Sequence, residues 1–292
     1  MDAAELHYEM VHTRGLTFEV STHGRGDKLA LLLHGFPETA HCWRYQIPLL
    51  ERLGYRVWAP NMRGYGRSDK PRGRAAYRMD HLEQDVTDLI DASGARSVLL
   101  MGHDWGGGVA WSYASYGERP IERLAIMNSP HPAIFQRELM RGPQLLRSWY
   151  MLLFQLPWLP ERMLRANDYA ALVRGTRGWA INKQNFSDRD MDVLREGLSQ
   201  PGALTAMLNY YRAMPSTVPL MLRRGARKIR VPTLLLWAEL DRALGKELTA
   251  GTERFVDKLR LEFVPNASHW VQQDAPEVVN RALEAWLASP AG

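Results

Sequence analysis

The feature that most constrains the fold is a series of short, nearly continuous apolar runs separated by segments with helical periodicity. We interpret as buried strands the runs Leu29–Leu33, Arg56–Ala59, Ser97–Met101, Leu124–Met127, Thr233–Trp237 and Arg260–Val264. Continuous apolar strands are typical of a parallel sheet that helices cover on both faces. Helical patterns occur at Met79–Ser93, Gly107–Tyr116 and Pro276–Ala288. This alternation predicts a doubly wound α/β domain.

The beginning of the chain shows a different pattern. Leu6–Thr13 and Leu16–Thr22 alternate apolar with polar residues and are separated by only two residues. Strict alternation is typical of a strand that is buried on one face only. We therefore expect these two runs to form an antiparallel pair with one face exposed to solvent.

The alternation of strands and helices stops in the middle of the chain, where a long segment has helical periodicity and almost no strand signal. Ser187 is suited to cap one of its helices, and Pro201 suits the first turn of the next. The simplest architecture is a core domain of residues 1–130 and 231–292, with a helical cap domain of residues 131–230 inserted into it.

Composition places the chain among ordinary soluble globular proteins, with 46% hydrophobic and 24% charged residues over 292 positions. A single cysteine, Cys42, excludes an internal disulfide framework and favours a reducing compartment. No apolar stretch is long enough to span a bilayer. The first ten residues are acidic and polar, unlike a secretory signal. We expect a cytoplasmic protein without a membrane partner.

The net charge of +5 raises the question of nucleic-acid binding. The densest basic run, Arg223–Arg230, contains no aromatic residue on which a base could stack, and we interpret it as a solvated linker. We therefore expect no nucleic-acid partner. The chain also lacks the ligand spacing of a metal site, so neither a metal nor another cofactor is expected.

The run from Val98 to Gly108 contains the candidate nucleophile. An apolar strand leads into Gly102-His103-Asp104-Trp105-Gly106 and then into a helix. This is the pattern of a nucleophile elbow, with Asp104 in the position of the nucleophile. Glycine at both ends lets the backbone turn tightly, and the helix N-terminus favours an ionised carboxylate. Asp104 could alternatively do no more than cap the helix, and the turn by itself does not distinguish the two.

The loop after an earlier strand reads His34-Gly35-Phe36-Pro37-Glu38. In enzymes with a nucleophile elbow, this loop donates one oxyanion N–H and the residue after the nucleophile donates the other. The expected donors are therefore Phe36 and Trp105. The Phe36–Pro37 bond could be cis, which sequence does not decide. We interpret His34 and His103 as structural residues, and Glu38 as a cap of the next helix.

A general base is expected late in the chain if the order is nucleophile, acid, histidine. His269 fits, because it lies in a polar loop after the last expected strand. The acid that orients it should follow the preceding strand, where Asp241 is the first choice and Glu239 the second. Another position for this acid, after the strand that ends at Met127, holds Asn128, which cannot carry a negative charge.

With these segments identified, the chain resembles the epoxide hydrolases of the α/β-hydrolase superfamily over nearly its whole length. The resemblance is carried by His34–Glu38, Arg63-Gly64-Tyr65-Gly66-Arg67-Ser68-Asp69-Lys70-Pro71, His103–Gly107, Asn209-Tyr210-Tyr211-Arg212 and Ala267-Ser268-His269-Trp270. It implies an α/β-hydrolase fold with a cap that carries two tyrosines. By position these are Tyr211 and, from a looser match, Tyr150. The alternative for Tyr150 is an aromatic residue that fills the core of the cap.

The resemblance also implies the chemistry. Asp104 would attack an epoxide carbon and form an alkyl-enzyme ester, while Tyr150 and Tyr211 hold the epoxide oxygen. His269, oriented by Asp241, would then activate water to release a diol. A cap rich in Leu, Met and Trp predicts an apolar pocket and thus a small apolar substrate. The oligomeric state is left open between a monomer and a homodimer.

Two other functions are compatible with the same residues. A dehalogenase uses an Asp nucleophile too, and Trp105 could bind its halide. Haloacetate dehalogenases typically have arginines near the nucleophile, where this chain has Trp105 and Gly108, and haloalkane dehalogenases often have Asn in place of Phe36. The cap tyrosines favour epoxides. The remaining alternative is a non-catalytic ligand receptor on the same fold.

Overall fold

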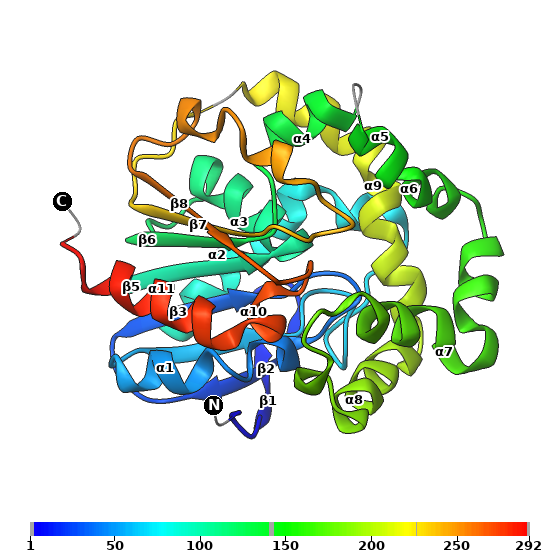
Figure 1. Cartoon of the computed structure of the whole chain (residues 1–292), viewed down its shortest axis with the longest axis horizontal. Coiled ribbons are helices and arrows are strands. Elements are labelled where there is room, and N and C mark those ends of the chain that lie inside the picture. Colours follow the sequence, from blue (N-terminus) through cyan, green and yellow to red (C-terminus); the bar gives the residue numbers. More distant parts are fainter. Residues whose placement is uncertain (1–2, 140–142, 226, 291–292) are drawn as a thin grey trace.

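The computed structural model describes residues 3–139, 143–225 and 227–290. They form one eight-stranded sheet with the order β1-β2-β4-β3-β5-β6-β7-β8 (Figure 1). Strands β1 and β2 are antiparallel, as are β2 and β4, and all other neighbours are parallel. The strands are β1 (Tyr8–His12), β2 (Thr17–His23), β3 (Lys28–Leu33), β4 (Arg56–Pro60), β5 (Ser97–His103), β6 (Arg123–Met127), β7 (Thr233–Ala238) and β8 (Leu259–Val264).

Helices precede and follow the strands and also fill the segment between β6 and β7. Those around the sheet are α1 (Ile47–Arg52), α2 (Met79–Ser93), α3 (Asp104–Tyr116), α10 (Val271–Asp274) and α11 (Pro276–Ala288). Between β6 and β7 lie α4 (Pro132–Leu139), α5 (Pro143–Arg147), α6 (Trp149–Phe154), α7 (Leu159–Trp179), α8 (Asp188–Ser199) and α9 (Ala203–Arg224). Short 3₁₀ helices are η1 (Ala40–Trp43), η2 (Arg74–Tyr77), η3 (Lys183–Asn185), η4 (Lys246–Thr249) and η5 (Thr252–Arg254).

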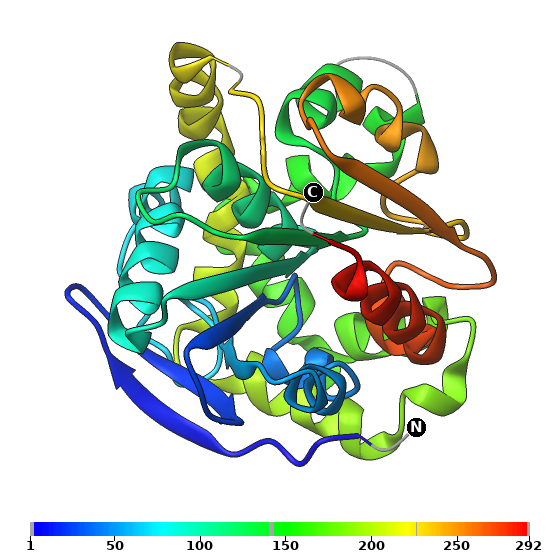
Figure 2. The ribbon, with the colours of Figure 1, turned by 90° about the vertical axis from the view of Figure 1, so that its left-hand side faces the viewer.

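Successive side chains of a strand point to opposite faces of the sheet, and both faces are buried here. Leu29, Leu31 and Leu33 of β3 pack in the same core as α2 and α3. Ala30 and Leu32 pack in a second core with α1 and α11. Figure 2 shows these two helix layers on opposite sides of the sheet. The doubly wound α/β fold expected from the apolar runs is therefore confirmed.

The N-terminal strands pair antiparallel as expected, but the expected solvent-exposed face is wrong for β2. Glu19 and Ser21 are buried. The loop after β4 contacts Glu19, whose N–H donates to Ser68 Oγ at 2.9 Å. The Glu19 carboxylate compensates for its burial by accepting hydrogen bonds from Asn61 Nδ2 at 2.7 Å and from the N–H of Arg67 at 2.8 Å. Alternation therefore identified the strand but not its exposure.

The segment between β6 and β7 is helical, as expected. Ser187 caps α8 through a capping box with Asp190, which confirms its expected role. The expected position of Pro201 is wrong. It lies before Gly202, which is the N-cap of α9 and has a φ of 78°, so the first turn of α9 begins only at Ala203. None of the described helices combines the length and apolar character needed to cross a membrane, and the cytoplasmic location stays a prediction.

The turn between β5 and α3 yields a stability prediction. A Cβ atom on Gly106 would lie 2.1 Å from the carbonyl oxygen of Leu33, whereas one on Gly108 in the same helix would meet nothing within 4 Å. We expect Gly106→Ala to lower the free energy of unfolding by about 2 kcal/mol or more, because backbone must move. Gly108→Ala should leave it unchanged or raise it by up to about 1 kcal/mol. Urea denaturation followed by circular dichroism measures both, and equal midpoints would contradict the prediction.

Candidate active site

Asp104 lies at the N-terminus of α3, directly after β5, in the left-handed conformation with a φ of 50°. The N-cap position belongs to His103, so Asp104 does not cap the helix. Gly35 lies so close that a Cβ atom there would be 2.5 Å from the Cβ of Asp104. The hydroxyl of Ser129 donates to the carbonyl oxygen of Asp104 at 2.8 Å. The strained turn is thus held by contacts from two other loops.

The loops bring Asp104, His269 and Asp241 together in one row. Nδ1 of His269 lies 2.8 Å from Asp241 Oδ2, and Nε2 lies 3.5 Å from Asp104 Oδ2. Because a carboxylate only accepts hydrogen bonds, the imidazole donates from Nδ1 to Asp241. Nε2 therefore points at the candidate nucleophile, in the arrangement of an oriented general base.

Asp241 is held in place beside His269 by three further hydrogen bonds. Its Oδ1 accepts from the N–H groups of Ala243 at 2.7 Å and Leu244 at 2.9 Å, and its Oδ2 also accepts from Asn128 Nδ2 at 2.6 Å. The sequence excludes Asn128 as the acid but does not predict that Asn128 binds the acid, as it does here. The second choice for the acid, Glu239, is exposed near Lys246 instead.

The charges of this row are coupled. Burial opposes the charged form of His269, but the carboxylates of Asp241 and Asp104 outweigh it and hold the pKa of His269 well above its usual value. Burial likewise would raise the pKa of Asp104, yet the hydrogen bond and charge of His269 keep that pKa below the usual value. Asp104 is thus an ionised carboxylate at neutral pH.

Phe36 and Trp105 both lie at Asp104. The N–H of Phe36 donates to Asp104 Oδ1 at 2.9 Å, and the Phe36–Pro37 peptide bond is cis. Trp105 follows Asp104 in α3, and its ring packs edge-to-face on Tyr211 at 5.1 Å between centroids. His34 has the structural role expected of it, because burial lowers its pKa to about 4 and its Nε2 accepts the N–H of Met62 at 3.0 Å.

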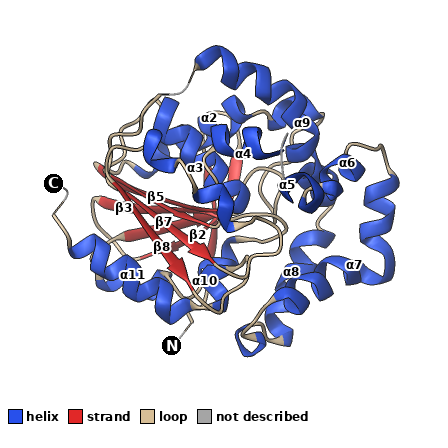
Figure 3. Cartoon of the chain, turned by 45° about the horizontal axis from the view of Figure 1, so that its top comes forward, coloured by secondary structure: helices blue, strands red, loops and turns tan. Residues whose placement is uncertain are grey.

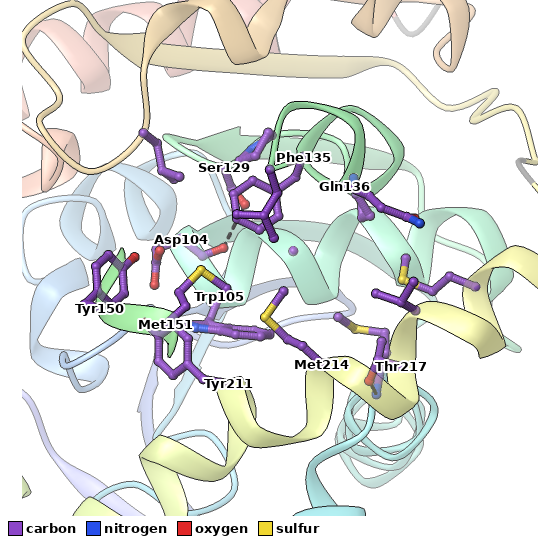
Figure 4. Close-up of a pocket in the computed structure, with 18 residues that line it drawn as sticks. Asp104, Trp105, Ser129, Phe135, Gln136, Tyr150, Met151, Tyr211, Met214 and Thr217 are labelled. Atoms are coloured by element: carbon purple, nitrogen blue, oxygen red, sulfur yellow. Dashed lines mark hydrogen bonds between the residues drawn. The ribbon is translucent and has the colours of Figure 1, made fainter. Parts of the chain in front are cut away.

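The two predicted tyrosines come from different helices and meet at the nucleophile. Tyr150 of α6 and Tyr211 of α9 have ring centroids 6.0 Å apart, and both line a cavity with Asp104. Figure 4 shows Tyr150 beside the Asp104 carboxylate at one end of this cavity. Burial raises the pKa of both hydroxyls, and the nearby Asp104 carboxylate adds to the rise, so both keep their protons at neutral pH.

The rest of the cavity is apolar and runs along α9. From Tyr211 to Met221 the helix rises by about 15 Å, and Met214 and Val218 lie on the same wall. At the end away from Tyr150, Figure 4 shows Gln136 and Thr217. Within the described residues, no three or more His, Cys, Asp or Glu side chains gather as metal ligands would.

A second polar cluster, which sequence did not reveal, supports the histidine loop. His103 Nδ1 lies 2.8 Å from Glu38 Oε2, and its Nε2 lies 2.9 Å from the carbonyl oxygen of His269. Gln272 and Gln273 donate to the same glutamate. The expected role of Glu38 as a helix cap is therefore wrong, since Thr39 caps η1. The only signal of this cluster in the sequence is the presence of polar residues beside two motifs: Glu38 follows the His34–Pro37 turn, and Gln272 and Gln273 follow His269.

Comparison with known proteins places the chain in a family. The model of the alpha/beta hydrolase fold family matches residues 30–276. A Bacillus subtilis protein named AB hydrolase superfamily protein YfhM is 41% identical over 96% of this chain and 97% of its own length. Human epoxide hydrolase 4 is 38% identical over 96% and 78%.

Among solved structures, an inhibitor complex of Bacillus megaterium epoxide hydrolase superimposes with a TM-score of 0.88 at 28% identity, and the match covers 96% of this chain and 100% of that one. The resemblance seen in the sequence motifs is thus confirmed along nearly the full length. The chain belongs to the α/β-hydrolase superfamily and, within it, to the epoxide hydrolase family.

Proposed function

We propose that the protein hydrolyses epoxides to vicinal diols through a covalent ester on Asp104, with residues 131–230 acting as a cap domain over a core of residues 1–130 and 231–292. The observation that carries this proposal is the pairing of opposite chemistries across one cavity. Asp104 and His269 come from the sheet side, and the two protonated tyrosines, Tyr150 and Tyr211, come from the cap side. A nucleophile and acids that face each other suit the opening of a strained ring.

In the first step, Asp104 attacks one ring carbon. Oδ1 accepts the N–H of Phe36, whereas Oδ2 faces Nε2 of His269 at 3.5 Å, and we assign Oδ2 as the oxygen that forms the new carbon–oxygen bond. The carbon–oxygen bond of the epoxide breaks, and its oxygen takes a proton from Tyr150 or Tyr211. A phenol suits this role because the raised pKa values keep the proton in place until the alkoxide develops.

In the second step, His269 removes a proton from water, and the resulting hydroxide attacks Cγ of Asp104. The oxyanion forms on Oδ1, which the N–H of Phe36 already contacts and toward which we assign the N–H of Trp105 as a second donor. Collapse of this intermediate breaks the ester bond and releases the diol. The departing oxygen takes its proton from the carboxyl group that water has just formed on Cγ, and the proton that His269 took from water restores the imidazolium of the free protein. The cycle therefore consumes only water and needs no metal or organic cofactor.

The interaction between the charges of His269 and the two carboxylates determines that ester formation precedes the activation of water. In the free protein, both carboxylates favour the protonated form of His269. Once Asp104 is an ester, it is neutral, and one of the two anions that stabilise the imidazolium is gone. The pKa of His269 must then fall, and the imidazolium gives its proton to the tyrosinate left by the first step. The neutral ring becomes a base only after the nucleophile has reacted.

This coupling can be measured on the free protein by NMR titration of the His269 ring. We expect Asp104→Asn, which resembles the ester in charge, to lower the pKa of His269. Asp241→Asn should lower it as well, whereas Glu239→Gln, at the surface, should not. Intact mass confirms that the amides persist. An unchanged pKa in Asp104→Asn would refute the coupling.

The interaction of His269 with Asp104 also makes the stability of the fold depend on pH. The pKa of His269 is higher in the folded than in the unfolded chain, where it is about 6.5. Its contribution to the free energy of unfolding is therefore complete below pH 6.5 and is lost as pH rises through the folded-state value. Asp104→Asn should show a smaller loss over that range in urea denaturation.

Covalent catalysis is tested by trapping. His269→Gln cannot activate water, so we expect it to gain the mass of one epoxide, such as styrene oxide, on a peptide that contains Asp104. The double variant Asp104→Ala, His269→Gln should gain nothing. Normal diol formation by Asp104→Ala would disprove the mechanism. Halide release from 1-bromohexane in a parallel assay, without diol formation from epoxides, would establish a dehalogenase instead.

The cap tyrosines are tested by removing their hydroxyls. We expect Tyr150→Phe with Tyr211→Phe to lower kcat/KM for epoxides by roughly 10²–10⁴-fold, the contribution of a positioned acid. Tyr210→Phe is the matched control, because Tyr210 precedes Tyr211 but donates to the carbonyl oxygen of Arg63 at 2.9 Å. It should destabilise the fold by about 1 kcal/mol and change kcat/KM only a few-fold. If the double variant kept full activity, a different acid would be required.

A further inference from the structure

A concentration of exposed apolar side chains lies on the cap helices. Thirteen large apolar side chains are exposed in the described part of the chain, and seven of them fall within residues 145–163. Scattered exposed apolar residues are ordinary, but a cluster of this size marks an interaction surface. We call this cluster the cap patch, and it consists of Leu145, Leu146, Trp149, Leu152, Leu156, Trp158 and Met163.

Two members of the cap patch lie on the outer side of α6, whose inner side is well packed. In α6, Met151 and Phe154 are buried and Tyr150 lines the active-site cavity. Trp149 and Leu152, three residues apart on the opposite side, are 63% and 72% exposed. Figures 1 and 3 both show α5, α6 and α7 at the side of the molecule away from the sheet. The exposed side chains therefore face outward from a firmly placed helix.

Among the described residues, the charged side chains beside the cap patch that have no ion-pair partner are positive. The 18 residues from Pro143 to Pro160 contain no Asp or Glu and one basic residue, Arg147, which pairs with Glu247 at 2.6 Å. Arg162 and Arg165 then line a surface groove beside Trp158, and neither forms an ion pair within the described residues. The acid between Trp158 and Arg162, Glu161, is bound by Arg212 at 2.6 Å. The margin of the cap patch is thus cationic.

We propose that the cap patch docks on the surface of a phospholipid membrane that contains anionic headgroups. Tryptophan prefers the headgroup level, leucine side chains enter the boundary of the acyl chains, and arginine attracts the anionic lipids. Such surface binding requires no spanning helix. It departs from the expectation, drawn from the sequence, that the chain has no membrane partner.

A second copy of the chain is the other apolar occupant to consider, and the charges argue against it. A two-fold contact would place the same patch on both sides. Arg162 and Arg165 of each copy would then border a segment with no acidic residue to pair with them. An anionic lipid surface meets the same arginines with opposite charge.

Docking would also bear on substrate supply, a consequence that rests on the proposed function. Apolar epoxides dissolve in lipid. Because α6 has Tyr150 on its inner side and Trp149 on its outer side, docking would place one wall of the active-site cavity against the phase that holds the substrate.

The test is flotation of the full chain with vesicles of equal parts phosphatidylcholine and phosphatidylglycerol. We expect wild type to float. Leu146→Asn with Leu152→Asn should lower the partition coefficient at least about tenfold, because two leucines no longer leave water. The matched control is Leu222→Asn with Leu240→Asn, which alters two exposed leucines elsewhere and should bind as wild type does.

A second pair of variants tests the charge. Arg162→Gln with Arg165→Gln should lower partitioning about fivefold per arginine on the anionic vesicles, and should have no such effect on vesicles of pure phosphatidylcholine. Circular dichroism and diol formation show that each variant remains folded, since none of these residues belongs to the catalytic row.

The proposal is overturned if wild type does not float, or if the two leucine pairs lose binding equally. It is also overturned if sedimentation shows a dimer that Leu146→Asn with Leu152→Asn dissociates while vesicles bind nothing. The vesicles contain no epoxide, so a failure here leaves the hydrolysis of epoxides untouched, and a failure of hydrolysis leaves flotation untouched.

Discussion

The close approach of the β3 loop to the start of α3 is the constraint on which the site depends. Gly106 packs against the carbonyl oxygen of Leu33, and Gly35 packs against the side chain of Asp104, at distances that exclude a Cβ atom. Only this approach lets the N–H of Phe36 reach Asp104 Oδ1. The parallel sheet makes it possible, because β3 and β5 are neighbours whose carboxyl ends meet at the same edge.

Burying charge at that edge requires compensation, and the surrounding residues supply it. The Asp241 carboxylate accepts hydrogen bonds from His269, Asn128 and two backbone N–H groups, which compensate for its burial. His269 lies between two carboxylates, which explains its raised pKa despite burial. The cluster of His103 and Glu38 holds the backbone of the same loop. The site is therefore kept rigid by the groups that keep it charged.

The helical segment between β6 and β7 supplies the tyrosine hydroxyls that the edge of the sheet does not provide. Adjacent residues of α9 have different partners: the Tyr210 hydroxyl donates to the carbonyl oxygen of Arg63, and Tyr211 lines the cavity. In the preceding helix of the insertion, Asp190 of α8 pairs with His41 at 2.6 Å. Asp274 accepts from the N–H of Ser268 at 2.6 Å and from the N–H of Asn182 at 2.6 Å. The loop of His269 and the inserted segment between β6 and β7 thus share the Asp274 carboxylate.

The sequence by itself determined where the strands and helices lie and in which order the candidate catalytic residues occur along the chain. Periodicity depends only on residues near one another in the chain, so it located the strands, the closing helix and the helical insertion. The glycines of the elbow indicated Asp104 as the candidate nucleophile, since a tight turn demands them, and the order of Asp104, Asp241 and His269 along the chain supported it. Tertiary structure alone decided that Asp241 rather than Glu239 reaches His269, that Asn128 binds this acid, that Glu38 turns to His103, and that β2 is buried on both faces. Each of these depends on the direction of a side chain, and that direction is set by packing against elements distant in the chain.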